Sequence, residues 1–107
     1  MDIQYILLEE VTYGEKVPLS LLDELLGLEL VDYRRESPDV IYIAEPHCEV
    51  LRTMLRLSTD LSINAAGIET IMHMRQRLTE LNREVRRLRQ LEAAYHAMRP
   101  ASVIEEV

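Results

Sequence analysis

Histidine and cysteine are the side chains that most readily bind a metal or act as a nucleophile, and this chain has few of them. They are His47, His73, His96 and Cys48. The histidines are scattered, and the one close pair is His47-Cys48. Adjacent residues on a helix point about 100° apart, so such a pair rarely shares one metal ion. We therefore expect no metal site, and we expect Cys48 to act as a small buried hydrophobic residue.

Paired carboxylates are the next candidates for chemistry, and they occur at Glu9-Glu10 and Asp23-Glu24. Adjacent carboxylates on short helices are usually solvated rather than catalytic. With only Gly14, Gly27 and Gly67, the chain has no glycine-rich loop to cradle a phosphate. The sequence predicts a protein that is not an enzyme and needs no cofactor.

Charge divides the chain into two unlike parts. The net charge is −7, but residues 1–49 hold twelve acids and three bases, whereas residues 50–107 hold seven acids and nine arginines. An acidic surface repels phosphate and attracts basic proteins. Ordinary solubility is the simpler explanation of surface charge, yet so uneven a division favours a basic protein partner.

Composition also indicates the compartment. A single cysteine excludes an internal disulfide and suits a reducing cytoplasm. The first residues lack the basic segment and apolar run of a signal peptide, and no stretch is long and apolar enough to span a membrane. We expect a cytoplasmic protein with no membrane association.

The first thirty residues predict small local elements. Residues 3–6 read as a short strand, and residues 7–11 as one or two helical turns closed by a turn at Gly14. Pro18 suits the first position of the next helix, and Gly27 suits a left-handed residue that ends it. Asp23 and Glu24 are left on the outer face. The expected buried stripe of this helix is Leu19, Leu22, Leu25 and Leu26, widened by Leu21.

Two β-prone runs follow, at residues 30–35 and 40–44, and the segment 36–39 between them contains Ser37-Pro38-Asp39. This pattern predicts a hairpin. Pro46 then begins another helix, with Arg52 and Arg56 on one face. Its expected apolar side is Cys48, Leu51, Met54, Leu55 and Leu57.

A long helix from Asn64 to Met98 dominates the second half. Asn64 is a favourable N-cap, and Ile63 can pack on Ile68 as a hydrophobic staple. Apolar residues then recur at alternating spacings of three and four, the a/d pattern of a coiled coil. The predicted dimer interface is Ile71, Met74, Leu78, Leu81, Val85 and Leu88.

The length of this helix implies a partner. At 1.5 Å per residue it would extend roughly 50 Å, whereas a folded chain of this size has a radius of gyration of about 13 Å. Leucines exposed at this density require a partner surface, and a second copy of the chain is the simplest one. We predict a homodimer with a module at residues 1–63, a dimerisation helix at 64–99 and a loose tail at 100–107.

The arginines of the long helix allow two interpretations. They surround the apolar seam rather than forming one stripe, and some have acidic neighbours, such as Glu80 with Arg83 and Glu84 with Arg87 or Arg89. A salt-bridged coiled-coil surface is the first interpretation, and a nucleic-acid groove is the second.

The order of elements resembles the MerR-like winged-helix superfamily: short helix, turn, second helix, two-stranded wing, third helix and long dimerising helix. Two stretches, at residues 24–31 and 55–69, also resemble the CbpM-type chaperone-modulator family. The second is the more specific, because Asp60-Leu61-Ser62-Ile63-Asn64-Ala65-Ala66-Gly67-Ile68 is similar to that family's linker. The resemblance runs from about residue 3 to about residue 90.

This resemblance implies both a fold and a function. The fold is mainly α: a MerR-like winged helix with a small β-hairpin wing, followed by a long C-terminal coiled-coil helix, paired antiparallel as in the superfamily. The implied function is a homodimeric inhibitor that binds the J domain of a CbpA- or DnaJ-like co-chaperone and keeps it from Hsp70. The acids expected to contact the basic J domain are Asp23, Glu24, Glu9 and Glu10.

Departures from DNA-binding MerR regulators bear on the choice of partner. Their second helix carries an Arg and a Tyr that meet phosphate and base, whereas residues 19–26 read Leu-Ser-Leu-Leu-Asp-Glu-Leu-Leu. Acids at a phosphate-docking position oppose binding, so we expect no nucleic-acid partner. Two alternatives stay open: a MerR-type transcription factor, and a subunit whose long helix pairs with a different coiled-coil protein.

Overall fold

The computed structural model describes residues 2–98. The elements in chain order are β1 (Tyr5–Leu7), α1 (Leu8–Val11), α2 (Leu19–Leu26), β2 (Tyr33–Ser37), β3 (Val40–Ala44), the 3₁₀ turn η1 (Glu45–His47), α3 (Cys48–Leu61) and α4 (Ala65–Met98). The chain separates into two compact units, Met1–Met72 and His73–Val107, so the first two turns of α4 belong to the N-terminal unit. The functional division after residue 63 stays a prediction, and the tail at 100–107 lies outside the described residues.

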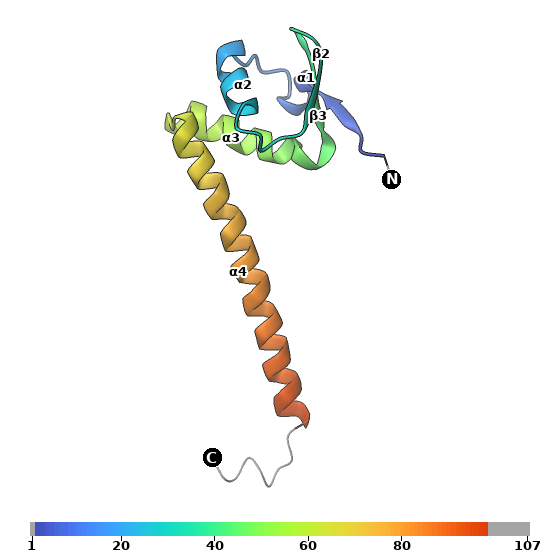
Figure 1. Ribbon diagram of the computed structural model, residues 1–107, viewed down its shortest axis with the longest axis vertical. Helices are drawn as coiled ribbons and strands as arrows, with labels where there is room; N and C mark the ends of the chain where they lie inside the picture. Colours follow the sequence, from blue (N-terminus) through green and yellow to red (C-terminus); the bar gives the residue numbers. More distant parts are fainter. Residues whose placement is uncertain (1, 99–107) are drawn as a thin grey trace. The chain divides into compact units, whose positions relative to one another are not determined.

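A three-stranded antiparallel sheet has the order β1-β3-β2 (Figure 1). The predicted hairpin is confirmed: β2 and β3 pair, with Arg34 opposite Tyr42. The first strand lies on the other side of β3, with Ile6 opposite Ile43. On β3 the residues Ile41 and Ile43 are buried, because this central strand turns one face to the core.

The core of the N-terminal unit is aliphatic and lies between the sheet and helices α2 and α3. Ile68, at the start of α4, is fully buried in the same cluster. The predicted stripe of α2 is right for Leu22, Leu25 and Leu26, but wrong for Leu19, which is 47% exposed. Leu19 is the first residue of the helix, and its neighbours cover only about half of its surface.

Both ends of α2 differ from the prediction. Pro18 is the residue before the helix, with φ −56° and ψ 133°, rather than its first residue. Gly27 has φ −67° and is right-handed, so the prediction of a left-handed glycine was wrong. The left-handed residue is Glu29, at φ 60°. The chain makes an extra turn through residues 27–29 before reversing, because the Leu28 and Glu29 amides donate to Leu25 and Leu26 carbonyls.

Helix α3 follows the prediction closely, with one adjustment at its start. Pro46 lies in η1 and α3 begins at Cys48. Cys48, Leu51, Met54 and Leu55 are buried as expected, and Leu57 packs against the core from a partly buried position. The helix ends at Ser62, which is left-handed at φ 56°.

The predicted cap of α4 is confirmed. The Gly67 amide donates to Asn64 Oδ1 at 2.8 Å, and this satisfies one of the unpaired amides of the first turn. Ile63, just before the cap, packs against the core cluster that contains Ile68. These contacts anchor the first turn of α4 in the N-terminal unit.

From Ala65 to Met98 α4 is one uninterrupted helix (Figure 1). Its residues from His73 onward are exposed. From Met74 onward the predicted seam is an exposed apolar stripe in the single chain, with Met74 at 62%, Leu78 at 58% and Leu81 at 43% exposure. Ile71, the first residue of the predicted seam, is half-buried. Within residues 2–98, no helix combines the length and the apolar character that crossing a bilayer demands.

Candidate functional site

The four acids predicted to contact a partner lie on two short helices. Glu9 and Glu10 are exposed on α1, and Asp23 and Glu24 are exposed on α2. The α2 helix positions its two acids outward because Leu22, Leu25 and Leu26 occupy its buried face. Within the described residues, no ion pair engages Glu9, Glu10 or Glu24.

Asp23 is the exception among these acids. Its Oδ1 accepts a hydrogen bond from Arg35 Nη2 on β2 at 2.6 Å. Both side chains remain partly exposed, 33% for Arg35 and 52% for Asp23. This contact ties the wing to α2 and partly cancels both charges.

The other arginine of the wing is also engaged. The Arg34 guanidinium carbon lies 4.2 Å from the centroid of the Tyr5 ring, a cation–π distance. Tyr5 donates its hydroxyl hydrogen to Asp32 Oδ2 at 2.9 Å. The Asp32 amide in turn donates to His47 Nδ1 at 2.8 Å. His47 is thus a structural acceptor that connects the base of the wing to η1.

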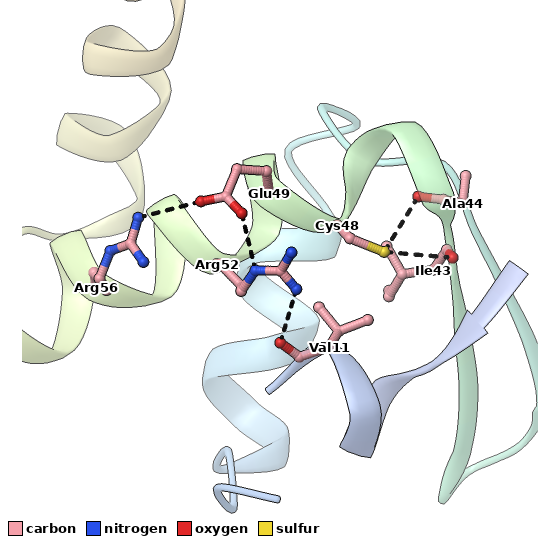
Figure 2. A network of polar contacts seen from close by, with 7 residues as sticks. All are labelled: Val11, Ile43, Ala44, Cys48, Glu49, Arg52 and Arg56. Atoms are coloured by element: carbon pink, nitrogen blue, oxygen red, sulfur yellow. Dashed lines mark hydrogen bonds and ion pairs between the residues drawn. The ribbon is translucent and has the colours of Figure 1, made fainter. Parts of the chain in front are cut away.

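A second polar network joins α3 to α1 (Figure 2). Glu49 lies between two arginines: Arg52 Nε is 3.0 Å from Glu49 Oε2, and Arg56 Nη2 is 3.5 Å from Glu49 Oε1. Arg52 also donates to the Val11 carbonyl at 3.2 Å. The hydrogen bond from Arg52 lowers the pKa of Glu49, and the same bond raises the pKa of Arg52. The predicted shared face of Arg52 and Arg56 is confirmed.

Cys48 lies at the other end of this view (Figure 2). It is 7% exposed, and its Sγ lies 3.6 Å from the Ala44 carbonyl oxygen. Burial raises the pKa of the thiol, with nearby Arg52 acting in the opposite direction. A buried thiol with a raised pKa is a poor nucleophile. Among residues 2–98 there is no group of three His, Cys, Asp or Glu side chains placed to hold a metal ion.

The arginines of α4 make local ion pairs. Arg87 contacts Glu84 at 2.6 Å, as the sequence predicted, and this hydrogen bond lowers the pKa of Glu84. Glu80 is paired with Arg77 at 3.4 Å rather than with the predicted Arg83. Both partners lie three residues from Glu80, on opposite sides of it along the helix, so spacing alone does not choose between them.

Sequence reasoning missed a groove between α1, the start of α2 and the β2–β3 turn. Its cavity volume is about 690 Å³. We call it the α1–α2 groove; its lining includes Leu8, Leu19, Ile41, Glu9, Glu15 and Asp39. Glu9 is the one predicted contact acid that lines it. No spacing pattern links Glu15 to Asp39, because the fold alone brings the two segments together.

Comparison with known proteins shows the family to which the chain belongs. The model of the MerR HTH family regulatory proteins matches residues 6–90, most of the chain. The chain belongs to the MerR family. No curated protein and no solved structure matches it.

The family match spans the winged-helix module and most of α4. In this MerR-family chain α2 carries Asp23 and Glu24 but no basic residue. The two arginines of its wing are held by Tyr5 and Asp23. The exposed face of α2 is therefore acidic in this MerR-family chain.

Proposed function

We propose that this MerR-family protein is a non-enzymatic modulator of a CbpA- or DnaJ-like co-chaperone. It binds the basic J domain through the acidic surface of its module and blocks engagement of Hsp70. The observation that carries the proposal is the charge of α2, which exposes Asp23 and Glu24 and has no base. The resemblance of residues 55–69 to the CbpM-type linker supports the same assignment.

Electrostatics supports a protein partner. Residues 1–49 carry a net charge of −9. Such a field accelerates encounter with a basic helix and slows encounter with a phosphate backbone. A J domain presents a basic helix to Hsp70, so an acidic module competes with Hsp70 for the same helix.

The alternative is a DNA-binding transcriptional regulator. Membership in a family described as HTH regulatory proteins favours it. DNA-binding proteins obtain most of their non-specific affinity from Lys and Arg at phosphates. The bases on β2 are Arg34 and Arg35, and each already has an intramolecular partner. We therefore rank DNA binding second.

Homodimerisation through α4 is part of the proposal. The exposed stripe of Met74, Leu78, Leu81, Val85 and Leu88 supports it, since a monomer seldom leaves so long an apolar row uncovered. An antiparallel pair is the arrangement that the resemblance implies. Pairing with a different coiled-coil protein is the competing possibility, and sedimentation of the purified chain alone distinguishes the two.

One set of measurements tests the proposed function. Calorimetry of the full chain with a purified J domain should give saturable binding, and the chain should suppress J-domain stimulation of the Hsp70 ATPase. A gel shift with random duplex at low salt should show no complex. Absence of J-domain binding would remove the proposal, and a retarded duplex at low salt would favour the transcriptional regulator.

A further inference from the structure

The α1–α2 groove is lined by both apolar and acidic residues. Leu8, Val17 and Leu19 are apolar lining residues that are at least partly exposed, and Glu9, Glu15 and Asp39 are the acids. Its volume is about 690 Å³, which lies within the range of about 300–1,000 Å³ that is usual for ligand pockets. Lys16 is the one basic residue among the lining residues. The groove therefore favours a ligand that is apolar and positively charged together.

Leu19 is the apolar group that a partner would cover. It is 47% exposed although the next leucine on its face, Leu22, is 2% exposed. Leu19 begins α2, so its position is fixed by the helix rather than by a flexible segment. Covering the exposed part of Leu19 with an apolar side chain of a partner is favourable, because it removes apolar surface from water.

The acids of the groove are not neutralised within the module. Among residues 2–98, the ion pairs involve other carboxylates and none includes Glu9, Glu15 or Asp39. Asp23 differs, because Arg35 already lies 2.6 Å away. These unpaired carboxylates line the same groove as the exposed Leu19, so one partner can contact both the acidic and the apolar groups.

The loop at residues 12–17, which forms one wall of the groove, is held in place by hydrogen bonds. The Gly14 amide donates to the Glu9 carbonyl at 2.8 Å, and Thr12 Oγ1 donates to the Glu15 carbonyl at 2.9 Å. Tyr13 and Gly14 both have positive φ, 54° and 81°. A non-glycine residue in this region persists only where its surroundings fix it. Because this loop is already ordered before a partner binds, less conformational entropy is lost on binding.

We infer that the α1–α2 groove is the docking site for a basic amphipathic helix of a protein partner. Apolar side chains on one face of that helix cover Leu19, and Lys or Arg side chains beside them pair with Glu9, Glu15 and Asp39. This is the helix-in-groove mode of recognition. The inference rests on the proposed function in one respect, since it extends the proposed J-domain contact from the outer face of α2 into this groove.

The test compares two matched pairs of variants of the full chain. Glu15→Lys with Asp39→Lys reverses two groove charges, and Glu36→Lys with Glu45→Lys reverses two exposed charges elsewhere in the module. Leu19→Ser removes the groove leucine, and Leu61→Ser removes a leucine that is 64% exposed outside the groove. Circular dichroism checks that each variant retains the helical content of the wild type.

Two probes are titrated by calorimetry: a purified J domain, and a synthetic Leu/Lys peptide with helical amphipathic spacing. A scrambled peptide of the same composition is the control. Each groove variant should bind both probes about tenfold more weakly, whereas the controls should stay within about twofold of wild type. Equal losses in groove and control variants would show a diffuse charge effect and overturn the inference.

The remaining outcomes separate the inference from the proposed function. If the J domain binds wild type and groove variants alike, the groove is not its site and the proposed function stands. If the amphipathic peptide binds through the groove and the J domain does not bind, the groove stands and the proposed partner is wrong. If the wild type binds neither probe, the groove inference is wrong.

Discussion

Arg35 on β2 and Asp23 on α2 form an ion pair in which Nη2 and Oδ1 are 2.6 Å apart. The pair connects the wing to the helix that precedes it, across twelve residues of sequence. It occupies an arginine that a DNA-binding wing would need and an acid that a J-domain site would use. The two carboxylates of α2 are therefore not equivalent, although they are neighbours in sequence.

Glu24 should matter more than Asp23 for binding a basic partner. Asp23→Asn removes a charge that Arg35 already balances, whereas Glu24→Gln removes one that no ion pair among residues 2–98 balances. We expect Glu24→Gln to weaken J-domain binding by about two- to fivefold and Asp23→Asn to weaken it less. Calorimetry at low ionic strength measures both, and a larger loss for Asp23→Asn would contradict this ranking.

The double variant Asp23→Lys with Glu24→Lys should weaken J-domain binding more strongly, because it also releases Arg35 as a further positive charge. We expect a loss of about tenfold or more, and the α4 dimer should persist. Calorimetry measures the first effect and sedimentation the second. An unchanged affinity would show that α2 takes no part in the site.

Leu81→Asp should convert the proposed dimer to monomers. Leu81 lies in the middle of the exposed stripe and is 43% exposed in the single chain. A buried, unpaired carboxylate in a coiled-coil seam costs several kcal/mol, roughly 3 or more. Sedimentation velocity should show the monomer mass. Gln76→Asp, on the same helix but outside the a/d positions, is the control and should stay dimeric.

The Glu49–Arg52 contact predicts how stability depends on pH. Arg52 holds the folded-state pKa of Glu49 below its ordinary value of 4.5. A lowered folded-state pKa means that the stabilisation is complete above pH 4.5 and is lost as the pH falls through the folded value. Thermal unfolding of wild type and Glu49→Gln should differ at pH 7, and the difference should shrink as the pH falls through the lowered pKa of Glu49. A difference that persists at low pH would contradict this assignment.

The cap of α4 predicts that replacing a helical glycine by alanine lowers stability here, the opposite of the usual effect. Gly-to-Ala in a helix ordinarily stabilises by up to about 1 kcal/mol. At Gly67 a Cβ would lie 2.7 Å from Ile63 Cγ2 and 3.2 Å from Asn64 Oδ1. Gly67→Ala should therefore destabilise the chain, because it displaces the residue that caps the helix and its branched neighbour. Urea denaturation measures the change, and Ala66→Gly, one residue earlier on an exposed position, should cost about 1 kcal/mol.

Patterns among residues close in sequence were sufficient to predict most of the secondary structure. Apolar residues at alternating spacings of three and four predicted α4, and the N-cap residue Asn64 predicted where it begins. The Ser37-Pro38-Asp39 segment predicted the hairpin, and β3 has the predicted bounds 40–44. The partner strand β2 begins at Tyr33, three residues later than predicted. These features depend on residues within a few positions of one another, so spacing and turn chemistry determine them.

The site was less predictable because it depends on contacts between distant segments. Arg52 bonds the Val11 carbonyl across 41 residues, and His47 accepts from Asp32 across 15. Leu19 fits the helical period of a buried stripe, yet it is 47% exposed. The gathering of Glu9, Glu15 and Asp39 around one groove follows from the packing of α1, α2 and the wing turn.

By itself the sequence determined the helices, the hairpin, the acidic module and the apolar seam, since each arises from the order and chemistry of neighbouring residues. Only the tertiary structure decided which charges remain available. Ion pairs such as Arg35–Asp23 form where separate elements meet, and burial or exposure of a side chain depends on what packs over it. That difference is why only the folded chain shows which of the acids on α1 and α2 are already paired.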